Sequence, residues 1–210
     1  GDPGTAGAGG AGGTGSTPGT AGSAGTAVSA GGNGGAGGAG AAGVTGVGAR
    51  NTIIATIGVD AGPAGVAVSP DGARAYITNL DTVSVIDTAT NTVTATIGGF
   101  RLPTGVAVSP DGARAYVANL FGASVSVLDT ATNTVTATIG GFTLPTGVAV
   151  TADGTRAYIT NWGGTTVSVV DTATNTVTAT IGGFTNPFGV AVSPDGTRAY
   201  ITNEGGTSVS

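Results

Sequence analysis

The sequence contains no cysteine, no histidine and no lysine. Without cysteine there is no disulfide framework and no thiolate metal site, and without histidine the commonest general base and metal ligand is missing. Only 8% of the 210 residues are charged, against roughly 25% in an ordinary soluble domain. We therefore expect no metal, no cofactor and no enzyme activity that depends on such groups.

Positive charge is scarce as well, because the six basic residues are all arginine and the net charge is −5. Such a chain offers no basic patch that could neutralise a phosphate backbone, so we expect no nucleic-acid partner. No run approaches the roughly 18 consecutive apolar residues of a membrane span. The chain begins Gly-Asp-Pro, without an initiator Met or a signal-like segment, and we expect Gly1 to be an internal point of a longer protein.

The composition changes near residue 49. Residues 1–49 are mostly Gly and Ala with scattered Ser and Thr, and they include no aromatic residue. Because this segment has little apolar surface to bury, its composition favours a flexible, low-complexity linker. Paired glycines recur every three residues over 31–39. This period is compatible with an extended left-handed helix whose backbones pack closely at the glycines, which is the alternative to a linker.

Residues 50–210 form an internal repeat, which is the signature of an architecture built from stacked units. The octapeptide Gly-Val-Ala-Val-Ser-Pro-Asp-Gly at 65–72 returns three times at spacings of 40, 42 and 42 residues, once with Thr-Ala in place of Ser-Pro. The repeat units cover about 65–104, 105–146, 147–188 and 189–210.

Each unit holds four short segments that are rich in β-branched residues or alternate in hydrophobicity, and turn residues bound each segment. Ser109-Pro110-Asp111-Gly112 predicts a type I turn, and 129–133 predicts a turn stabilised by Asp and Asn side chains. No segment has helical periodicity. In the second unit the predicted strands, named a to d, cover 106–108, 114–118, 125–128 and 134–139.

Units of about 40 to 45 residues with four strands are typical of propeller blades, and a single blade cannot bury its own faces. We therefore predict an all-β fold: a β-propeller of four-stranded antiparallel blades, about four in this chain. The small, apolar strand a suits the inner position near the axis. Strand d places Val135, Ala137 and Ile139 on one face and threonines on the other, as expected of the outermost strand.

The two ends of the repeat region are complementary. Residues 51–57 align with strand d but follow no strands a to c, and the fourth unit stops at Ser210 within strand c. Because a free sheet edge invites aggregation, 51–57 is a candidate closing strand for a four-bladed monomer. A truncated larger ring and a ring shared by two chains in a homodimer are the alternatives.

The repeated sequences resemble a known family. Gly-Val-Ala-Val-Ser-Pro-Asp-Gly-x-Arg-Ala-Tyr and the later Val-Asp-Thr-Ala-Thr-Asn-Thr-Val-Thr-Ala-Thr-Ile are similar to YVTN-type β-propeller repeats of surface-layer proteins, over residues 51–210. The glycine-rich segment resembles that of mycobacterial PE-PGRS proteins. Together the two resemblances imply a mycobacterial cell-surface, cell-wall or secreted protein whose PE domain lies outside this chain. The YVTN group includes lactonase-like propellers, but no catalytic set is matched here.

Residues that repeat in register are best explained by blade architecture. This applies to Phe100, Phe142 and Phe184, which we expect to pack between blades, and to the Asp, Arg and Tyr of each unit. The turn aspartates are Asp71, Asp111, Asp153 and Asp195, the arginines are Arg74, Arg114, Arg156 and Arg198, and the tyrosines are Tyr76, Tyr116, Tyr158 and Tyr200.

Residues that occur once are the better candidates for ligand binding. Because chain direction alternates between strands, the b–c and d–a loops share one end of the propeller, and these loops vary most. Aromatic and Arg side chains are common anchors of interfaces, and Trp also stacks on sugar rings or cations. The predicted ligand-binding residues are Asp60, Asp81, Arg101, Phe121, Trp162, Phe188 and Glu204.

These observations predict a non-enzymatic scaffold that binds a protein or a glycan through its loop-rich end. Drift in exposed loops would explain single-copy residues without any function. Two other functions stay open: a structural spacer in the cell envelope, and a lactonase-like propeller enzyme that relies on Asp60, Asp81 or Glu204.

Overall fold

The computed structural model describes residues 53–210, so the predicted linker at 1–49 and the first two residues of the candidate closing strand lie outside the described residues. The chain divides between Thr56 and Ile57, and the strands of the described residues lie in the second unit. The only helical element within 53–210 is the short 3-10 helix η2 (Leu120–Gly122). No helix in this part of the chain is long and apolar enough to cross a membrane.

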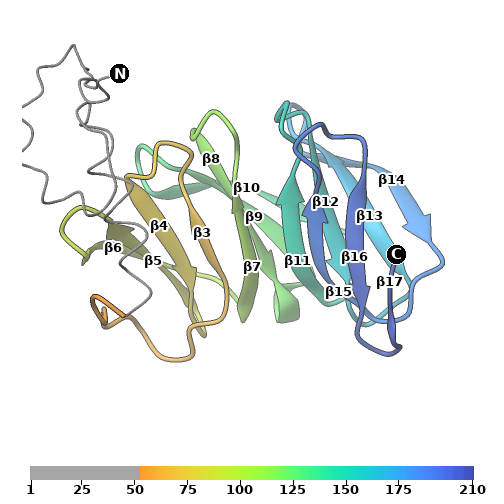
Figure 1. Cartoon of the computed structure of the whole chain (residues 1–210), viewed down its shortest axis with the longest axis horizontal. Coiled ribbons are helices and arrows are strands. Elements are labelled where there is room, and N and C mark those ends of the chain that lie inside the picture. The colour runs from red at the N-terminus through yellow and green to blue at the C-terminus, as the bar shows by residue number, and fades with distance from the viewer. Residues whose placement is uncertain (1–52) are drawn as a thin grey trace, which may run out of the picture. The chain divides into compact units, whose positions relative to one another are not determined.

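The second unit consists of antiparallel sheets that follow one another along the chain (Figure 1). Sheet 1 contains β3 (Val66–Val68), β4 (Arg74–Thr78), β5 (Thr82–Asp87) and β6 (Thr92–Gly98). Sheet 2 contains β7 (Pro103–Val108), β8 (Arg114–Asn119), β9 (Ser124–Asp129) and β10 (Thr134–Gly140). Sheet 3 contains β11 (Pro145–Val150), β12 (Arg156–Asn161), β13 (Thr166–Asp171) and β14 (Thr176–Gly182). Sheet 4 contains β15 (Pro187–Val192), β16 (Ala199–Asn203) and β17 (Ser208–Val209).

Each sheet is a meander in which a strand pairs with the next one in the chain. The first strands of successive sheets lie beside each other, since β3 contacts β7, β7 contacts β11 and β11 contacts β15. Strand a is therefore innermost and strand d outermost, as the sequence predicts. The four predicted strands of the second unit are confirmed, and strand a begins earlier than predicted, at Pro103. The fold is all-β, with propeller-like blades.

The turn between strands a and b is built by its own polar side chains. In the second unit the Gly112 N–H donates to the Ser109 carbonyl at 2.8 Å, and Gly112 has a φ of 73°. The Ser109 hydroxyl donates to the Asp111 carboxylate at 2.5 Å, and the Ala113 N–H donates to the same oxygen at 2.9 Å. These hydrogen bonds, that of Ser109 foremost, lower the pKa of Asp111. The repeated Asp thus has a structural role, as predicted.

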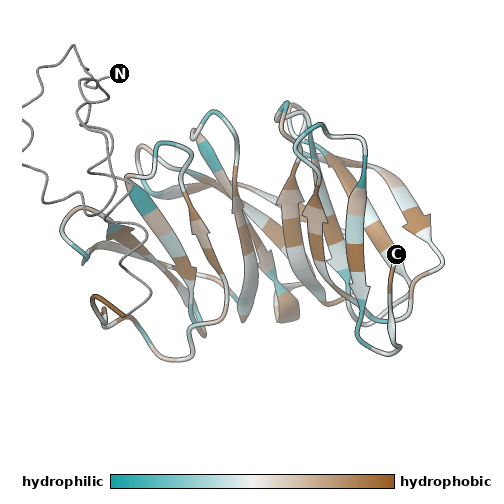
Figure 2. Ribbon diagram, in the orientation of Figure 1, coloured by the Kyte–Doolittle hydropathy of each residue, from teal (hydrophilic) through white to brown (hydrophobic). Residues whose placement is uncertain are grey.

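Hydrophobic residues alternate with polar ones along the strands (Figure 2), and buried hydrophobic clusters lie between sheets 1 and 2 and between sheets 2 and 3. Between sheets 1 and 2, the buried Tyr76, Val85 and Phe100 pack with Val106 and Val117. Each internal sheet therefore has one face toward the previous sheet and one toward the next. Because both faces are covered, four consecutive residues of strand c, Val125 to Leu128 in sheet 2, are buried, the serine among them included.

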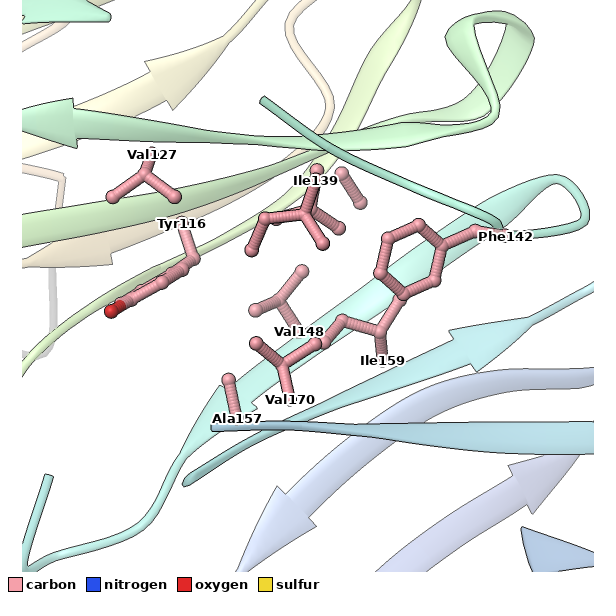
Figure 3. Packing of buried hydrophobic residues seen from close by; sticks show 10 residues of the cluster. Tyr116, Val127, Ile139, Phe142, Val148, Ala157, Ile159 and Val170 are labelled. Carbon is pink, nitrogen blue, oxygen red and sulfur yellow. The ribbon is translucent and has the colours of Figure 1, made fainter. Parts of the chain in front are cut away.

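The space between sheets 2 and 3 is filled in the same manner (Figure 3). Tyr116 and Ile139 of sheet 2 pack with Ile159 and Val170 of sheet 3, and the Phe142 ring lies over the end of this cluster. The predicted packing role of the repeated phenylalanines is thus seen for Phe142, and equally for the buried Phe100.

A repeated glycine at the inner strands allows neighbouring sheets to approach closely. A Cβ atom on Gly105 of β7 would lie 2.2 Å from the carbonyl oxygen of Thr146 on β11, far inside van der Waals contact. Gly147 lies in the same way against the carbonyl of Phe188 on β15. The glycines that begin the first three octapeptides, Gly65, Gly105 and Gly147, are therefore required by backbone packing between blades, whereas Gly189 of sheet 4 would meet only the Thr202 side chain, at 3.2 Å.

The row of sheets is not closed by strand pairing within 53–210. Sheet 4 has three strands, and β17 pairs with β16 alone. Residues 53–57 form no strand, and closure of the ring by 51–57 stays a prediction. In Figure 1 sheet 1 lies at the left end of the row, and sheets 3 and 4 overlap at the right.

Candidate functional site

The predicted site lies where the irregular connections meet. Because the strands of each sheet are antiparallel, the b–c loops and the d–a connections emerge at one end, the lower edge of Figure 1. The a–b and c–d turns, whose sequences are nearly identical between units, lie at the opposite end. We call the first set the variable end, which comprises 60–62, 79–81, 99–102, 120–123, 141–144, 162–165, 183–186 and 204–207.

Backbone hydrogen bonds dock each b–c loop onto the d–a connection that precedes it. The Leu120 N–H donates to the Leu102 carbonyl at 3.0 Å, and the Trp162 N–H donates to the Leu144 carbonyl at 3.0 Å. The same bond joins Glu204 to the carbonyl of Asn186 at 3.1 Å in the incomplete fourth sheet. The loops of the variable end are thus anchored by main-chain groups, which leaves their side chains available for other contacts.

Six of the seven predicted residues lie within these connections, and the prediction that all seven lie in loops is wrong for one. Phe188 is the second residue of β15, where its carbonyl accepts hydrogen bonds from the Thr160 and Thr146 hydroxyls at 2.7 and 3.0 Å. It nevertheless lies close to the variable end, next to Pro187, which follows the connection 183–186 and is paired with Asn203. The β-branched residues of this strand begin only at Val190, whereas β15 itself begins at Pro187, and this explains why Phe188 lies in a strand.

Trp162 and Glu204 are brought together across two sheets. They occupy the same position in successive units, directly after the repeated Asn that ends strand b. The Trp162 indole Nε1–H donates to the Glu204 carboxylate. This bond holds the ring of the half-buried Trp162 in place and leaves part of it accessible to solvent. Both are predicted site residues, but the sequence does not predict their contact, because they are 42 residues apart.

Asp60 and Asp81 lie at the first sheet but make different contacts. The Asp60 carboxylate accepts a hydrogen bond from the Thr82 hydroxyl at 2.7 Å. Asp81 is exposed, and its carbonyl accepts from the Phe100 N–H at 3.3 Å. No hydrogen bond among the described residues joins the two carboxylates to one shared donor.

Arg101 and Phe121 lie side by side at the second sheet. The Phe121 N–H donates to the Arg101 carbonyl at 3.2 Å, and both residues are exposed. The short helix η2 carries Phe121, and Ala123, with a φ of 49°, reverses the chain after it. Phe121 is 65% exposed at this turn, and Phe188 on β15 is 45% exposed.

Sequence reasoning missed one exposed apolar residue of the variable end. Leu80 is 52% exposed and holds the position that Trp162 and Glu204 occupy in later units. The signal was present in the sequence, because the residue that follows the repeated Asn varies between units. Leu120, at the same position in the second unit, is buried instead, since η2 begins there.

The variable end therefore presents partly exposed aromatic rings, one guanidinium and three carboxylates. Such a set can stack on flat or apolar groups and bind polar ones. Within residues 53–210, no three His, Cys, Asp or Glu residues are close enough to hold a metal ion.

Comparisons with known proteins identify the fold. No protein-family model matches the chain, and a search of curated proteins gives no match. Among solved structures, the chain is similar to Kuenenia stuttgartiensis hydrazine synthase, with a TM-score of 0.65 and 30% identity, over 72% of this chain and 44% of that one. It is also similar to a functionally unknown protein from Desulfotomaculum acetoxidans DSM 771, with a TM-score of 0.66 and 21% identity, over 73% of this chain and 52% of that one.

The chain thus spans about half the length of these two solved chains. Together with the sheet topology, the similarities identify a β-propeller-like repeat fold.

Proposed function

We propose that the chain is a non-enzymatic binding scaffold whose variable end captures a protein or a glycan. The observation that carries this proposal is the Trp162–Glu204 hydrogen bond, which holds the Trp162 ring in place among loops whose sequences differ between units. A ring fixed before binding loses little conformational freedom when a ligand stacks on it, which favours affinity.

The surroundings of Trp162 support the same function. Phe121 and Phe188 offer additional apolar surface at the same end, and Arg101 supplies a charged donor. Aromatic and Arg side chains contribute most of the binding free energy at many protein interfaces. The opposite end has only the repeated polar turns, so the two ends differ in their capacity to bind.

The proposed location is the cell surface, the cell wall or the extracellular medium. The absence of cysteine neither supports nor opposes this location. The proposed location depends on the resemblance of the repeats and of the glycine-rich segment to envelope proteins. The similarity to hydrazine synthase covers 44% of that chain, so it supports the scaffold and assigns no reaction here.

Screening the chain against arrays of glycans and of extracellular proteins would test this function. Trp162→Ala and Phe121→Ala are expected to reduce affinity for any ligand found by tenfold or more, about 1.4 kcal/mol or above. Val177→Ala on β14 is the matched control, because Val177 is exposed but lies on an outer strand.

The proposal fails if the ligand binds both aromatic variants as tightly as the unmodified chain. A chain that binds no member of either array would favour the structural spacer. Hydrolysis of a lactone panel that is lost in Asp60→Asn or Asp81→Asn would favour the enzyme.

A further inference from the structure

The hydrogen bond between Trp162 and Glu204 gives the indole ring a defined electrostatic character. The indole Nε1–H donates to the Glu204 carboxylate, and a hydrogen bond from a neutral donor does not remove the negative charge of its acceptor. That charge therefore lies at the edge of the ring. Since the face of an aromatic ring is the negative part of its quadrupole, a carboxylate at the edge strengthens the attraction of the face for a cation.

The loop that carries the ring is also held in place. The Trp162 N–H donates to the Leu144 carbonyl at 3.0 Å. A Cβ atom on Gly163 would lie 2.7 Å from Cδ1 of Leu144, so the loop packs directly on that side chain. The ring and its carboxylate are thus positioned before a ligand arrives, which limits the conformational entropy lost on binding.

No cation within residues 53–210 neutralises Glu204. Arg101 lies in the connection between sheets 1 and 2, whereas Glu204 directly follows β16 of sheet 4. The other arginines of this range lie at the opposite end, at the first residue of strand b or just before it. None of them forms a salt bridge with Glu204 in this part of the chain. The carboxylate beside Trp162 is therefore able to pair with a cation that a ligand supplies.

The wider charge distribution favours the same kind of ligand. The variable end has three carboxylates, those of Asp60, Asp81 and Glu204, against the single guanidinium of Arg101. The whole chain has a net charge of −5 and contains no lysine. A field of this sign attracts positively charged partners at long range and disfavours acidic ones. A neutral glycan would gain nothing from these charges.

We propose that the variable end binds a positively charged segment of a protein partner, with a Lys or Arg side chain over the Trp162 ring and beside the Glu204 carboxylate. This inference rests on the proposed function and names its ligand. A cation on an aromatic face lies within about 6 Å of the ring centre, where a carboxylate at the ring edge is also within reach. The apolar stem of the side chain packs on the indole, while its charged group contacts Glu204.

The emission of Trp162, the only tryptophan of the sequence, reports binding at this site directly. Titration with N-acetyl-trilysine amide is expected to change the emission saturably, and added NaCl should weaken binding because salt screens the charges. The matched control ligand is the same peptide with every side-chain amine acetylated, which keeps the stems and removes the charges. It should bind more weakly by about fivefold or more.

Glu204→Gln separates the charge from the position of the ring, because the amide oxygen still accepts the indole hydrogen bond. This variant is expected to lower the affinity for the trilysine peptide by about fivefold or more. Asp81→Asn removes the same charge from sheet 1 and should have a smaller effect. Unchanged circular dichroism will show that both variants fold. Equal affinity of Glu204→Gln and the unmodified chain, or equal binding of the acetylated and unacetylated peptides, would overturn the cation site.

A neutral oligosaccharide, cellotriose, distinguishes failure of this inference from failure of the proposed function. Saturable quenching of Trp162 by cellotriose, without a response to the trilysine peptide, would overturn the cationic ligand and still support a binding surface. No response to either molecule, together with no ligand on the arrays, would overturn both proposals.

Discussion

Arg114 and Thr172 are 58 residues apart in sequence, yet the guanidinium Nη1 of Arg114 donates to the Thr172 carbonyl at 2.6 Å. Arg114 begins strand b of sheet 2, and Thr172 lies in the c–d turn of sheet 3. Arg74 makes the equivalent bond from sheet 1 to sheet 2. The arginines of the first two units, Arg74 and Arg114, therefore tie neighbouring blades together at the end opposite the variable end.

Arg114→Met should destabilise the fold by about 1 to 2 kcal/mol, because it removes one charge-assisted hydrogen bond and keeps most of the apolar stem. Urea unfolding followed by circular dichroism measures the change. Arg156→Met is the control, since Arg156 makes no equivalent bond within 53–210, and its effect should stay within about 0.5 kcal/mol. Equal effects of the two substitutions would show that the Arg114–Thr172 hydrogen bond contributes nothing to the free energy of unfolding.

Gly105→Ala should be among the most destabilising small substitutions. Its Cβ would lie 2.2 Å from the Thr146 carbonyl oxygen, so β7 and β11 would have to separate. We expect a loss of about 1 to 3 kcal/mol from this overpacking. Gly140→Ala on β10 meets nothing within 4 Å and should be close to neutral. Thermal unfolding compares them, and a neutral Gly105→Ala would contradict the close approach of the inner strands.

Stability should fall in acid because of the turn aspartates. The Ser109 hydroxyl and the Ala113 N–H lower the pKa of Asp111, and the Thr132 N–H and hydroxyl lower that of Asp129. A carboxyl whose pKa is lower in the folded chain stabilises the fold above its unfolded pKa, about 4, and this stabilisation is lost as the pH falls through the folded value. The unfolding temperature should therefore decline below about pH 4.

Asp111→Asn should weaken this decline, because an amide cannot be protonated in this range yet can still accept the Ala113 hydrogen bond. Differential scanning calorimetry between pH 6 and pH 2.5 measures both curves. An unfolding temperature of the unmodified chain that stays constant over this range would be evidence against a structural role for the turn carboxylates.

Glu204→Ala should release the indole of Trp162. Trp162 is the single tryptophan, so its fluorescence reports on this contact alone. We expect emission at longer wavelength and stronger acrylamide quenching, because the ring becomes more exposed to water. Glu204→Gln retains an acceptor and should resemble the unmodified chain, whereas identical spectra for Glu204→Ala would mean that the bond does not hold the ring.

The candidate site was only partly predictable. Selection of residues that occur once found Trp162, Glu204 and Phe121, because a repeat makes any departure from it visible. The contact between Trp162 and Glu204 was not predictable, since it depends on the distance between neighbouring sheets. The sequence predicts a loop at Phe188, because Pro187 and Gly189 reduce strand propensity, but backbone pairing with β16 overrides that preference.

By itself the sequence determined the strands, their turns and their order in each sheet, because alternation, β-branched residues and turn chemistry are local and repeat with every unit. Tertiary structure alone decided how neighbouring sheets contact each other. The close approach at the inner glycines and the ties made by Arg74 and Arg114 both follow from packing between units. Such packing depends on distances between residues far apart in the chain, and no local pattern encodes those distances.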